Sequence, residues 1–399
     1  MNLPNIDDMD VKGKRVLVRA DLNVPMKDGE IADDSRLSAA MPTLRNIIDR
    51  GGRLIVIAHL DRPGGKRDMS ASLRPVADAI REGLNGTSVA FAEDCVGPEA
   101  EDAVRDLAEG QCLVLENLRF HAGEKENDSG FAQALAKLAD IYVNDAFSAS
   151  HREHASITGL PTLLSSAAGL LMQKELETLE RLLAEPRHPY VALLGGAKAE
   201  TKVPVVEHLL DRADSILLGG VMATTFLQAR GAEVGRSKVD DAQVEAAKQL
   251  LERTGGAGAK LMLPVDVIVA SEMSAEAEGR VVAADRVGPE DMILDIGVET
   301  IRRYADAMSD ARTVVWNGPM GAAEFAPFQR GTHFLAAGIA ERTQTDDLVS
   351  VVGGGDTVAF LRRHQFLHVV SYASMAGGAF LKWLAGEDLP GVEALLKAG

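Results

Sequence analysis

Arginine, histidine and amide side chains follow four short apolar runs in the first half of the chain. They are Arg19, Asp21 and Asn23, then His59 and Arg62, then Asn117, Arg119 and His121, then Asn144, His151, Arg152 and His154. Any one of these cations is most simply a solvated or structural side chain. Four successive runs that end this way, in a chain with a formal net charge of −17, instead predict a site for a small polyanion. Arg36, which opens the next helical stretch, joins this set.

Glycine takes the place of these cations after the apolar runs of the second half. The segments are Gly195-Gly196-Ala197-Lys198, Gly219-Gly220, Asn317-Gly318-Pro319 and Gly353-Gly354-Gly355-Asp356-Thr357. Glycine after a strand lets backbone N–H groups approach a phosphate, and a following helix adds its positive end. Lys198 and Lys202 supply point charges for terminal phosphates, and Asp356 is the best-placed oxygen ligand for the Mg²⁺ that accompanies a nucleotide. A single glycine pair indicates only a tight turn, but together these segments predict a nucleotide site.

Other chemistries lack their motifs. The chain has no G-x-x-x-x-G-K-[ST] loop, and no G-x-G-x-x-G follows its first apolar run. The segment His151-Arg152-Glu153 lacks the Asp and the later Asn of a protein-kinase catalytic loop. Cys95 and Cys112 show no metal-ligand or disulfide spacing, and no His/Asp/Glu cluster suggests structural zinc. An NAD(P)-dependent oxidoreductase and a two-lobed solute-binding protein are the alternatives, weakened by the missing dinucleotide motif and the missing export signal.

The elements that must position these residues are strands alternating with helices. The apolar runs do not alternate with polar residues, as is typical of strands buried on both faces. They are Arg15–Val18, Leu54–Ala58, Cys112–Leu115, Ile141–Val143, Val191–Leu194, Ile216–Leu218, Val265–Val269, Val314–Trp316, Leu348–Val352 and His368–Val370. Helical spacing separates them, as in 37–48, where Pro42 predicts a kink or a break. We predict an α/β fold of two similar-sized lobes, each a mostly parallel sheet flanked by helices in a Rossmann-like three-layer arrangement.

Length and composition set the domain number and the class of partner. A chain of 399 residues suits two domains, and its 46% hydrophobic and 25% charged residues are typical of a folded protein. We expect an N-terminal domain over 1–168, an interdomain hinge helix over 169–186 and a C-terminal domain over 187–388, with the tail 389–399 packing on the first domain. An ordinary crossover helix is the alternative for 169–186. The acidic charge argues against nucleic acid and membrane partners, and we expect a cytoplasmic protein for which a monomer suffices.

The ordered motifs of the chain resemble those of the phosphoglycerate kinase family along essentially its whole length. The matching blocks are Arg19–Pro25, Asp34–Arg36, His59–Pro63, Glu116–His121, Asn144–Phe147, His151-Arg152, Gly195–Lys198, Leu263–Asp266, Trp316–Pro319 and Gly353–Thr357. The resemblance implies an N-terminal domain that binds 3-phosphoglycerate or 1,3-bisphosphoglycerate and a C-terminal domain that binds Mg²⁺ with ATP or ADP.

The resemblance also implies roles for individual residues. The phosphoglycerate site would comprise Asp21, Leu22, Asn23, Arg36, His59, Leu60, Asp61, Arg62, Arg119 and Arg152. The nucleotide site would comprise Gly195, Lys198, Lys202, Gly219, Asn317, Pro319, Glu324, Gly353, Gly354, Gly355, Asp356 and Thr357, with Asp356 as the metal ligand. Charge stabilisation during transfer would fall to Arg36, Lys198, Lys202, Gly354 and Gly377. Glu324, assigned to the ribose hydroxyls, has no support from the strand-end pattern.

Phosphoryl transfer to a carboxylate needs no general base, because that group is already ionised near neutral pH. The protein must supply in-line positioning and positive charge, and we expect closure about 170–186 to exclude water. Three departures from the usual family pattern bear on affinity and rate: Asp61 and Val221 stand where glycine is usual, and Met375-Ala376 replaces a Thr-Gly pair. Asp61 places a negative charge beside an anion site, so its side chain should point outward.

Overall fold

The computed structural model describes residues 3–254, 260–345 and 348–398, which divide into two compact units. Unit 1 is Met1–Thr178 with Asp388–Gly399, and unit 2 is Leu179–Glu387. Met1, Asn2 and Gly399, which the predicted domain ranges include, lie outside the described residues. The division between the units falls inside helix α6 (Leu170–Leu183), the helix that we predict to be the hinge.

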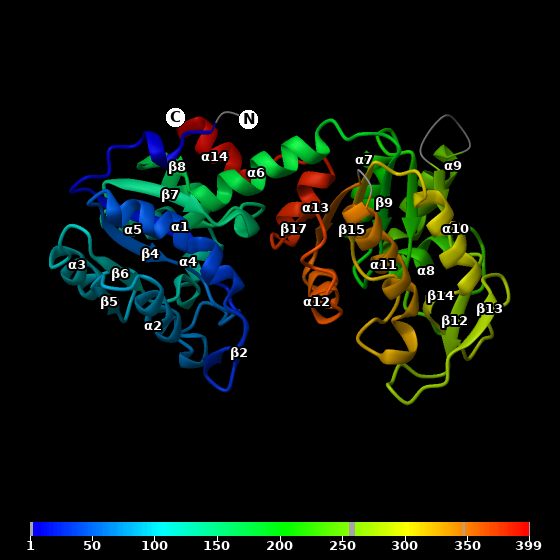
Figure 1. The fold of residues 1–399 in the computed structure, drawn as a ribbon. Helices are drawn as coiled ribbons and strands as arrows, with labels where there is room; N and C mark the ends of the chain where they lie inside the picture. Colours follow the sequence, from blue (N-terminus) through cyan, green and yellow to red (C-terminus); the bar gives the residue numbers. More distant parts are fainter. Residues whose placement is uncertain (1–2, 255–259, 346–347, 399) are drawn as a thin grey trace. The chain divides into compact units, whose positions relative to one another are not determined.

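Unit 1 is built on a six-stranded sheet in which all neighbouring strands are parallel (Figure 1). Its strands, in order across the sheet, are β5 (Val89–Ala92), β6 (Cys112–Leu115), β4 (Arg53–Ile57), β1 (Arg15–Ala20), β7 (Ile141–Asp145) and β8 (Ser165–Ala168). Val16 and Val18 of β1 pack in one core cluster with Leu44 of α1 (Ser35–Asp49) and Val76 of α2 (Arg74–Gly83). Because successive strand residues point to opposite faces, Arg19 faces the other side of the sheet, where it is also buried.

The remaining elements of unit 1 are short. They are the hairpin β2 (Met26–Lys27) and β3 (Glu30–Ile31), α3 (Pro98–Arg105), α4 (Ala122–Lys125), α5 (Ser129–Ala136), the 3-10 turns η1 (Ile6–Asp8), η2 (Met69–Ala71), η3 (Leu118–Phe120), η4 (Phe147–Ala149) and η6 (Leu160–Thr162), and the π turn η5 (Ala155–Gly159). The predicted break at Pro42 is wrong, because α1 continues through it. Pro42 and Ser38 both lie on the exposed face of α1, so water can satisfy the Ser38 carbonyl that proline leaves without a donor.

Unit 2 has a second six-stranded parallel sheet and a small antiparallel one (Figure 1). The parallel order is β11 (Lys260–Met262), β10 (Ser215–Leu218), β9 (Tyr190–Leu194), β15 (Thr313–Asn317), β16 (Val349–Gly353) and β17 (Tyr372–Ser374); the antiparallel order is β13 (Arg280–Ala283), β12 (Asp266–Ala270) and β14 (Met292–Ile296). The helical elements are α7 (Val203–Leu209), α8 (Gly220–Ala229), η7 (Asp241–Gln243), α9 (Val244–Arg253), α10 (Val298–Met308), η8 (Ala326–Phe328), α11 (Arg330–Thr345), α12 (Gly355–Arg363) and α13 (Gly378–Leu384). The two sheets confirm the predicted fold class.

Two predicted strands of unit 2 need correction. The run Val265–Val269 does form a strand, β12, but in the antiparallel sheet. Val267 packs in one core cluster and Ile268 in another, so burial on both faces imitates a parallel strand. The run His368–Val370 forms a turn, and its apolar residues reflect packing of Val370 against the core.

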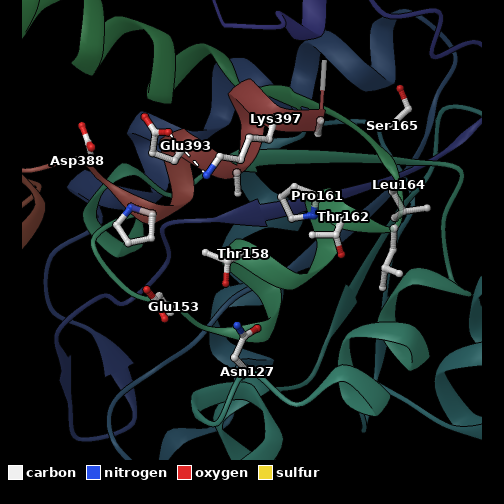
Figure 2. Close-up of a pocket in the computed structure, with 14 residues that line it drawn as sticks. Asn127, Glu153, Thr158, Pro161, Thr162, Leu164, Ser165, Asp388, Glu393 and Lys397 are labelled. Carbon is white, nitrogen blue, oxygen red and sulfur yellow. Dashed lines mark ion pairs between the residues drawn. The ribbon is translucent and has the colours of Figure 1, made fainter.

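The C-terminal helix α14 (Pro390–Ala398) belongs to unit 1, where the Gly391 N–H donates to the Ser150 carbonyl at 2.8 Å. Beside this helix lies a cavity of about 890 Å³, lined also by residues of the 153–165 segment. Figure 2 shows Glu393 and Lys397 of α14, which form an ion pair at 4.0 Å, on one side of this cavity. None of its lining residues is a predicted site residue, so we place the chemistry elsewhere.

Asp145, the last residue of β7, caps the N-terminus of α6 from inside the core. Its Oδ1 accepts hydrogen bonds from the backbone N–H groups of Leu171 at 2.9 Å and Met172 at 3.2 Å, whereas Oδ2 has no hydrogen-bond partner among the described residues. Burial raises the pKa of Asp145 to about 7, against the hydrogen bonds from Thr43 and the helix, which lower it. The folded protein therefore holds a proton here that the unfolded chain releases above its ordinary carboxyl pKa.

We predict that Asp145→Asn stabilises the protein more at pH 8 than at pH 5. Because the folded pKa is raised, wild-type stability from this group is present below the unfolded pKa of 3.8 and is lost as pH rises toward 7. Asparagine keeps the capping oxygen without the charge, so its advantage should grow by roughly 2–3 kcal/mol between pH 5 and pH 8. Urea unfolding at both pH values measures this, and a difference that does not change with pH would contradict it.

Candidate functional site

The cations predicted at the edge of the unit 1 sheet come together in the structure. The ends of β1, β4, β6 and β7 meet at the carboxyl edge because these strands are parallel neighbours. We call Arg62, Arg119 and Arg152 the cationic cluster, and His59 lies close enough to Arg119 and Arg152 for their charges to act on it. Arg152, Arg19 and Arg62 all lower the pKa of the Arg119 guanidinium, which places these charges close to one another. Such crowding of like charge favours an anionic ligand.

Arg119 offers hydrogen-bond donors that the protein leaves unused. Its Nη1 donates to the Asp61 carbonyl at 2.5 Å, but the buried Nε and Nη2 have no hydrogen-bond partner among the described residues. Burial, and then the charges of Arg152 and Arg19, lower the pKa of Arg119 to about 10, so it is still a cation at neutral pH. Buried N–H groups without partners are costly, and an anion would satisfy them.

The other predicted residues of unit 1 surround this cluster in different ways. Arg36 donates to Asp21 Oδ1 at 2.5 Å and to Ser148 Oγ at 3.2 Å, so a carboxylate holds its guanidinium. Leu22 and Leu60 are fully buried members of the core, which leaves only their backbone for a ligand.

Asp61 occupies a backbone conformation that favours glycine. Its φ is 54°, in the left-handed region, and its side chain is exposed, as we expect for an acid beside an anion site. Its N–H donates to Asn23 Oδ1 at 2.9 Å while its carbonyl accepts from Arg119. The Asp61 peptide therefore connects the β1 loop to Arg119.

His121, which the strand-end pattern groups with the cations, is engaged elsewhere. Its Nε2 hydrogen-bonds Asp94 Oδ1 at 2.6 Å, and its ring stacks on Phe131. Ligand atoms of Asp94, Cys95 and His121 lie within 4.8 Å of one another, a grouping that residue spacing does not reveal. Burial raises the pKa of the Cys95 thiol well above its ordinary value, which disfavours the thiolate that a metal would need.

Unit 2 contains a cavity of about 600 Å³ at the carboxyl edge of its parallel sheet. Of the predicted residues, Pro319, Glu324 and Asp356 line it, together with Gly196 of the first glycine pair. Most of the remaining lining is apolar, as in sites that enclose a planar ring. The size and lining suit a small molecule with one polar, anion-binding end.

Lys202 does not line the cavity, but it lies close to two residues that do, Gly196 and Asp356. It is 6% exposed, and its Nζ would lie 3.7 Å from a Cβ added to Gly196. Burial lowers the pKa of Lys202 to about 8, while Asp356 acts to raise it and Lys198 to lower it further. Lys198 itself is exposed. One buried and one exposed lysine therefore lie near the side of the cavity that Gly196 and Asp356 line.

The glycines of this edge serve two different purposes. A Cβ on Gly195 would lie 2.1 Å from the Pro319 carbonyl, one on Gly219 would lie 2.7 Å from Met320, and one on Gly353 would lie 2.3 Å from the Phe380 ring. Gly195 and Gly219 are required by packing against the loop after β15, and Gly353 by packing against Phe380 of α13. A Cβ on Gly355 or Gly377 would meet nothing within 4 Å, so at those two the open backbone itself is available to a ligand.

Two further predicted residues support the loops. The Thr357 hydroxyl accepts from the Gly318 N–H at 2.8 Å, and both residues are buried. Gly318 and Gly354 both have a φ of 92°. A Cβ added to Gly354 would lie 3.0 Å from Asn317 Nδ2, so the Gly354 backbone lies against the Asn317 amide. The β15 and β16 loops are thus fixed to each other before any ligand binds.

Sequence reasoning missed residues whose role depends on tertiary contacts. In unit 1 this is the buried Glu124; Arg19, which the strand-end pattern does include, has no place in the predicted phosphoglycerate site, and it lies behind the cationic cluster. In unit 2 they are cavity residues away from the strand ends, among them Thr224, Arg236, Lys238, Leu294 and Phe360. Thr224 could have been found, because it lies one helical turn after Gly220, on the face that begins at a strand end.

Comparison with known proteins agrees with this arrangement. The family model described as phosphoglycerate kinase matches residues 6–387. The chain is 50% identical over 390 residues to the phosphoglycerate kinase of Xanthobacter autotrophicus, covering 98% of each, and 47% identical over 395 residues to that of Cereibacter sphaeroides, covering 99% of this chain and 100% of the relative. The solved phosphoglycerate kinase of Coxiella burnetii is 38% identical with a TM-score of 0.86, over 99% of each chain.

A second solved structure, the phosphoglycerate kinase of Pyrococcus horikoshii, is 32% identical with a TM-score of 0.85, again over 99% of each chain. Within the described ranges, no helix combines the length and the apolar character that crossing a bilayer requires. The oxidoreductase and solute-binding alternatives find no support in these matches. Family model, relatives and solved structures agree along nearly the whole sequence, and the chain belongs to the phosphoglycerate kinase family.

Proposed function

We propose that this kinase transfers a phosphoryl group reversibly between 1,3-bisphosphoglycerate with ADP and 3-phosphoglycerate with ATP, as its family membership implies. The observation that supports this assignment best is the contrast between two sheet edges. The edge in unit 1 carries a cationic cluster with unused buried donors, and that in unit 2 carries the open backbone of Gly355 and Gly377 and a buried Lys202 next to Gly196. The first suits a small phosphorylated acid, and the second suits the phosphates of a nucleotide.

The residues at the two edges would position charge rather than move protons. In the direction that consumes ATP, the acceptor carboxylate of 3-phosphoglycerate is already ionised, so no side chain has to act as a base. Arg36, Lys198 and Lys202, with backbone N–H groups near Gly354 and Gly377, would stabilise charge on the transferring group. Arg62, Arg119, Arg152 and His59 would hold the phosphoglycerate; those four need only bind and orient.

Asp356 is suited to a magnesium ion that arrives with the nucleotide. Its carboxylate lies in the first turn of α12, lines the cavity and is close enough to Lys202 to oppose the lowering of that lysine's pKa by burial. One carboxylate together with substrate phosphates is the kind of oxygen donor set that Mg²⁺ takes in kinases. Bound there, the ion would neutralise phosphate charge, while Glu324 would accept from the ribose hydroxyls.

We also propose that the chain acts as a cytoplasmic monomer and that α6 is the hinge for closure over both substrates. Each substrate has its own set of residues, one in each unit, so transfer requires that the two bound substrates meet with water excluded. Small-angle scattering with both ligands bound should show a smaller radius of gyration than the ligand-free protein. An unchanged radius would count against closure, and sedimentation would test the monomer.

A coupled assay with 3-phosphoglycerate and Mg-ATP tests the activity itself. Formation of 1,3-bisphosphoglycerate is followed through its reduction by a dehydrogenase and the loss of NADH absorbance. We expect turnover that needs both the acid and Mg²⁺. No turnover from protein that shows a cooperative unfolding transition would refute the assignment.

Asp61→Asn should tighten phosphoglycerate binding. Asparagine tolerates the left-handed conformation as well as aspartate does, so only the negative charge beside the cationic cluster is removed. Because the side chain is exposed and screened, we expect KM for 3-phosphoglycerate to fall by only about two- to five-fold at low salt, and by less at high salt. Initial rates at two ionic strengths measure this; an increase in KM would show that the carboxylate assists binding.

A further inference from the structure

Arg19 lies behind the cationic cluster, fully buried, with every hydrogen bond directed at a protein group. Its Nη2 lies 2.7 Å from His59 Nδ1, its Nε donates to Ser156 Oγ at 3.0 Å, and its Nη1 donates to the Ala20 carbonyl at 2.6 Å. Arg19 therefore has a different task from Arg119, whose donors remain unused.

A buried carboxylate balances the charge of Arg19. Glu124 is 0% exposed and accepts from the Ser156 hydroxyl at 2.6 Å and from the Ser156 N–H at 2.9 Å. Burial alone would raise the pKa of Glu124, but hydrogen bonds from His154 and Ser156 and the charge of Arg19 lower it, so it is ionised. Since the Ser156 hydroxyl donates to Glu124, its oxygen accepts from Arg19. The direction of each hydrogen bond in the chain Glu124–Ser156–Arg19 is therefore determined.

The contact with the Arg19 guanidinium decides which nitrogen of His59 carries the proton. A guanidinium can only donate, so His59 Nδ1 must accept and cannot carry a proton. A neutral imidazole then holds its proton on Nε2. A doubly protonated ring would set Nδ1–H against an Arg19 N–H at 2.7 Å.

We propose that Glu124, Ser156 and Arg19 hold His59 as the Nε2–H tautomer, so that the ring donates one uncharged hydrogen bond to the phosphoglycerate anion, an inference that rests on the proposed function. Arg19 is thereby a positioning residue that acts through His59. The alternative, an imidazolium that adds one more charge to the cationic cluster, is incompatible with the Arg19 contact.

The surroundings of His59 keep this state over the physiological pH range. Arg19 faces it from β1, Arg119 from η3, and Arg152 and His154 from the segment between η4 and η5. Burial first, and then these four groups, lower the pKa of His59 well below its ordinary value of 6.5. Binding of the anion should then show no titration of this ring between pH 5.5 and pH 8.

Long-range ¹H–¹⁵N spectra of histidine side chains in the ligand-free protein test the tautomer directly, with His59→Gln used to assign the signals. We expect one protonated nitrogen, Nε2, and one bare nitrogen, Nδ1, from pH 5.5 to pH 8. An imidazolium pattern, or a proton on Nδ1, would overturn the proposal. This readout does not depend on turnover, so it separates failure of the proposal from failure of the proposed function.

Arg19→Met keeps the aliphatic stem and removes the donors. We expect the Nδ1–H tautomer of His59 to become populated beside the Nε2–H tautomer, because nothing then donates to Nδ1, and the pKa of the ring to rise while burial, Arg119, Arg152 and His154 still keep it below its ordinary value. Arg15→Met is the matched control, because Arg15 lies at the other end of β1 in a part-exposed pair with Asp140. If the control changes the His59 signals as much as Arg19→Met does, the effect is structural and the proposal fails.

Arg19→Lys provides a rescue, because an ammonium can still donate to Nδ1. It should restore the single Nε2–H tautomer, even if KM stays high. Should Arg19→Met not fold, the wild-type and Arg19→Lys spectra decide. A proton on His59 Nδ1 in Arg19→Lys would contradict the need for a donor at this position.

Discussion

Lys202→Ala should lower kcat by about 10²-fold or more, the largest effect on turnover that we expect from a single side chain in unit 2. Lys202 is buried next to Gly196 and near Asp356, two residues that line the cavity. A buried ammonium interacts more strongly with developing phosphate charge than an exposed one, because little water screens it. The loss should appear in kcat more than in KM, since the charge on the transferring group changes during the reaction.

The pKa of Lys202 gives this prediction a second readout. Burial lowers that pKa to about 8, so the free protein loses this positive charge as pH rises past 8. ADP affinity should therefore weaken between pH 7 and pH 9 in the wild type and lose that dependence in Lys202→Ala. Isothermal calorimetry at three pH values measures it.

Two other lysine variants serve as controls. Lys198→Ala should cost less than Lys202→Ala because Lys198 is exposed, and Lys248→Ala, on the exposed side of α9, should cost nothing measurable. Turnover of Lys202→Ala within about five-fold of the wild type would show that the charge is supplied elsewhere.

The parallel sheets could be predicted from the sequence because a strand buried on both faces needs an unbroken apolar run. The runs at 141–143 and 112–115 both show this unbroken apolar pattern, and the bounds predicted for the second match those of β6. β12 has the same kind of run for a different reason, since its two faces pack in separate clusters. Burial, and not the direction of the neighbouring strand, determines such a pattern.

The edge residues could be predicted for a related reason, because parallel strands bring their carboxyl ends together. That rule gives a residue's place along the sheet but not the direction of its side chain. Arg19 lies near the end of β1, and Arg119 and His121 follow β6. Arg19 turns inward to His59, whereas Arg119 retains unused donors and His121 pairs with Asp94. The partners that decide between these outcomes lie from 27 to 137 residues away in sequence, beyond the reach of local spacing.

Arg119→Met should weaken phosphoglycerate binding by about 10²-fold or more and yet stabilise the ligand-free protein. The two buried donors without partners would supply the lost affinity, since hydrogen bonds to a charged group contribute about 1.5–3 kcal/mol each. In the ligand-free protein these two unpaired donors are unfavourable, and Arg152 and Arg19 repel the guanidinium. Methionine removes both penalties. We expect a gain on the order of 1 kcal/mol in unfolding free energy at low salt.

The opposite signs are what make Arg119→Met informative. Calorimetry with 3-phosphoglycerate gives the affinity, and urea unfolding without ligand gives the stability. Arg62→Met is the matched control: Arg62 is exposed, so its loss should weaken binding without the gain in stability. If Arg119→Met instead destabilised the ligand-free protein by several kcal/mol, its bond to the Asp61 carbonyl would outweigh the unused donors. The guanidinium would then be a structural group, and the anion would have to bind to other members of the cationic cluster.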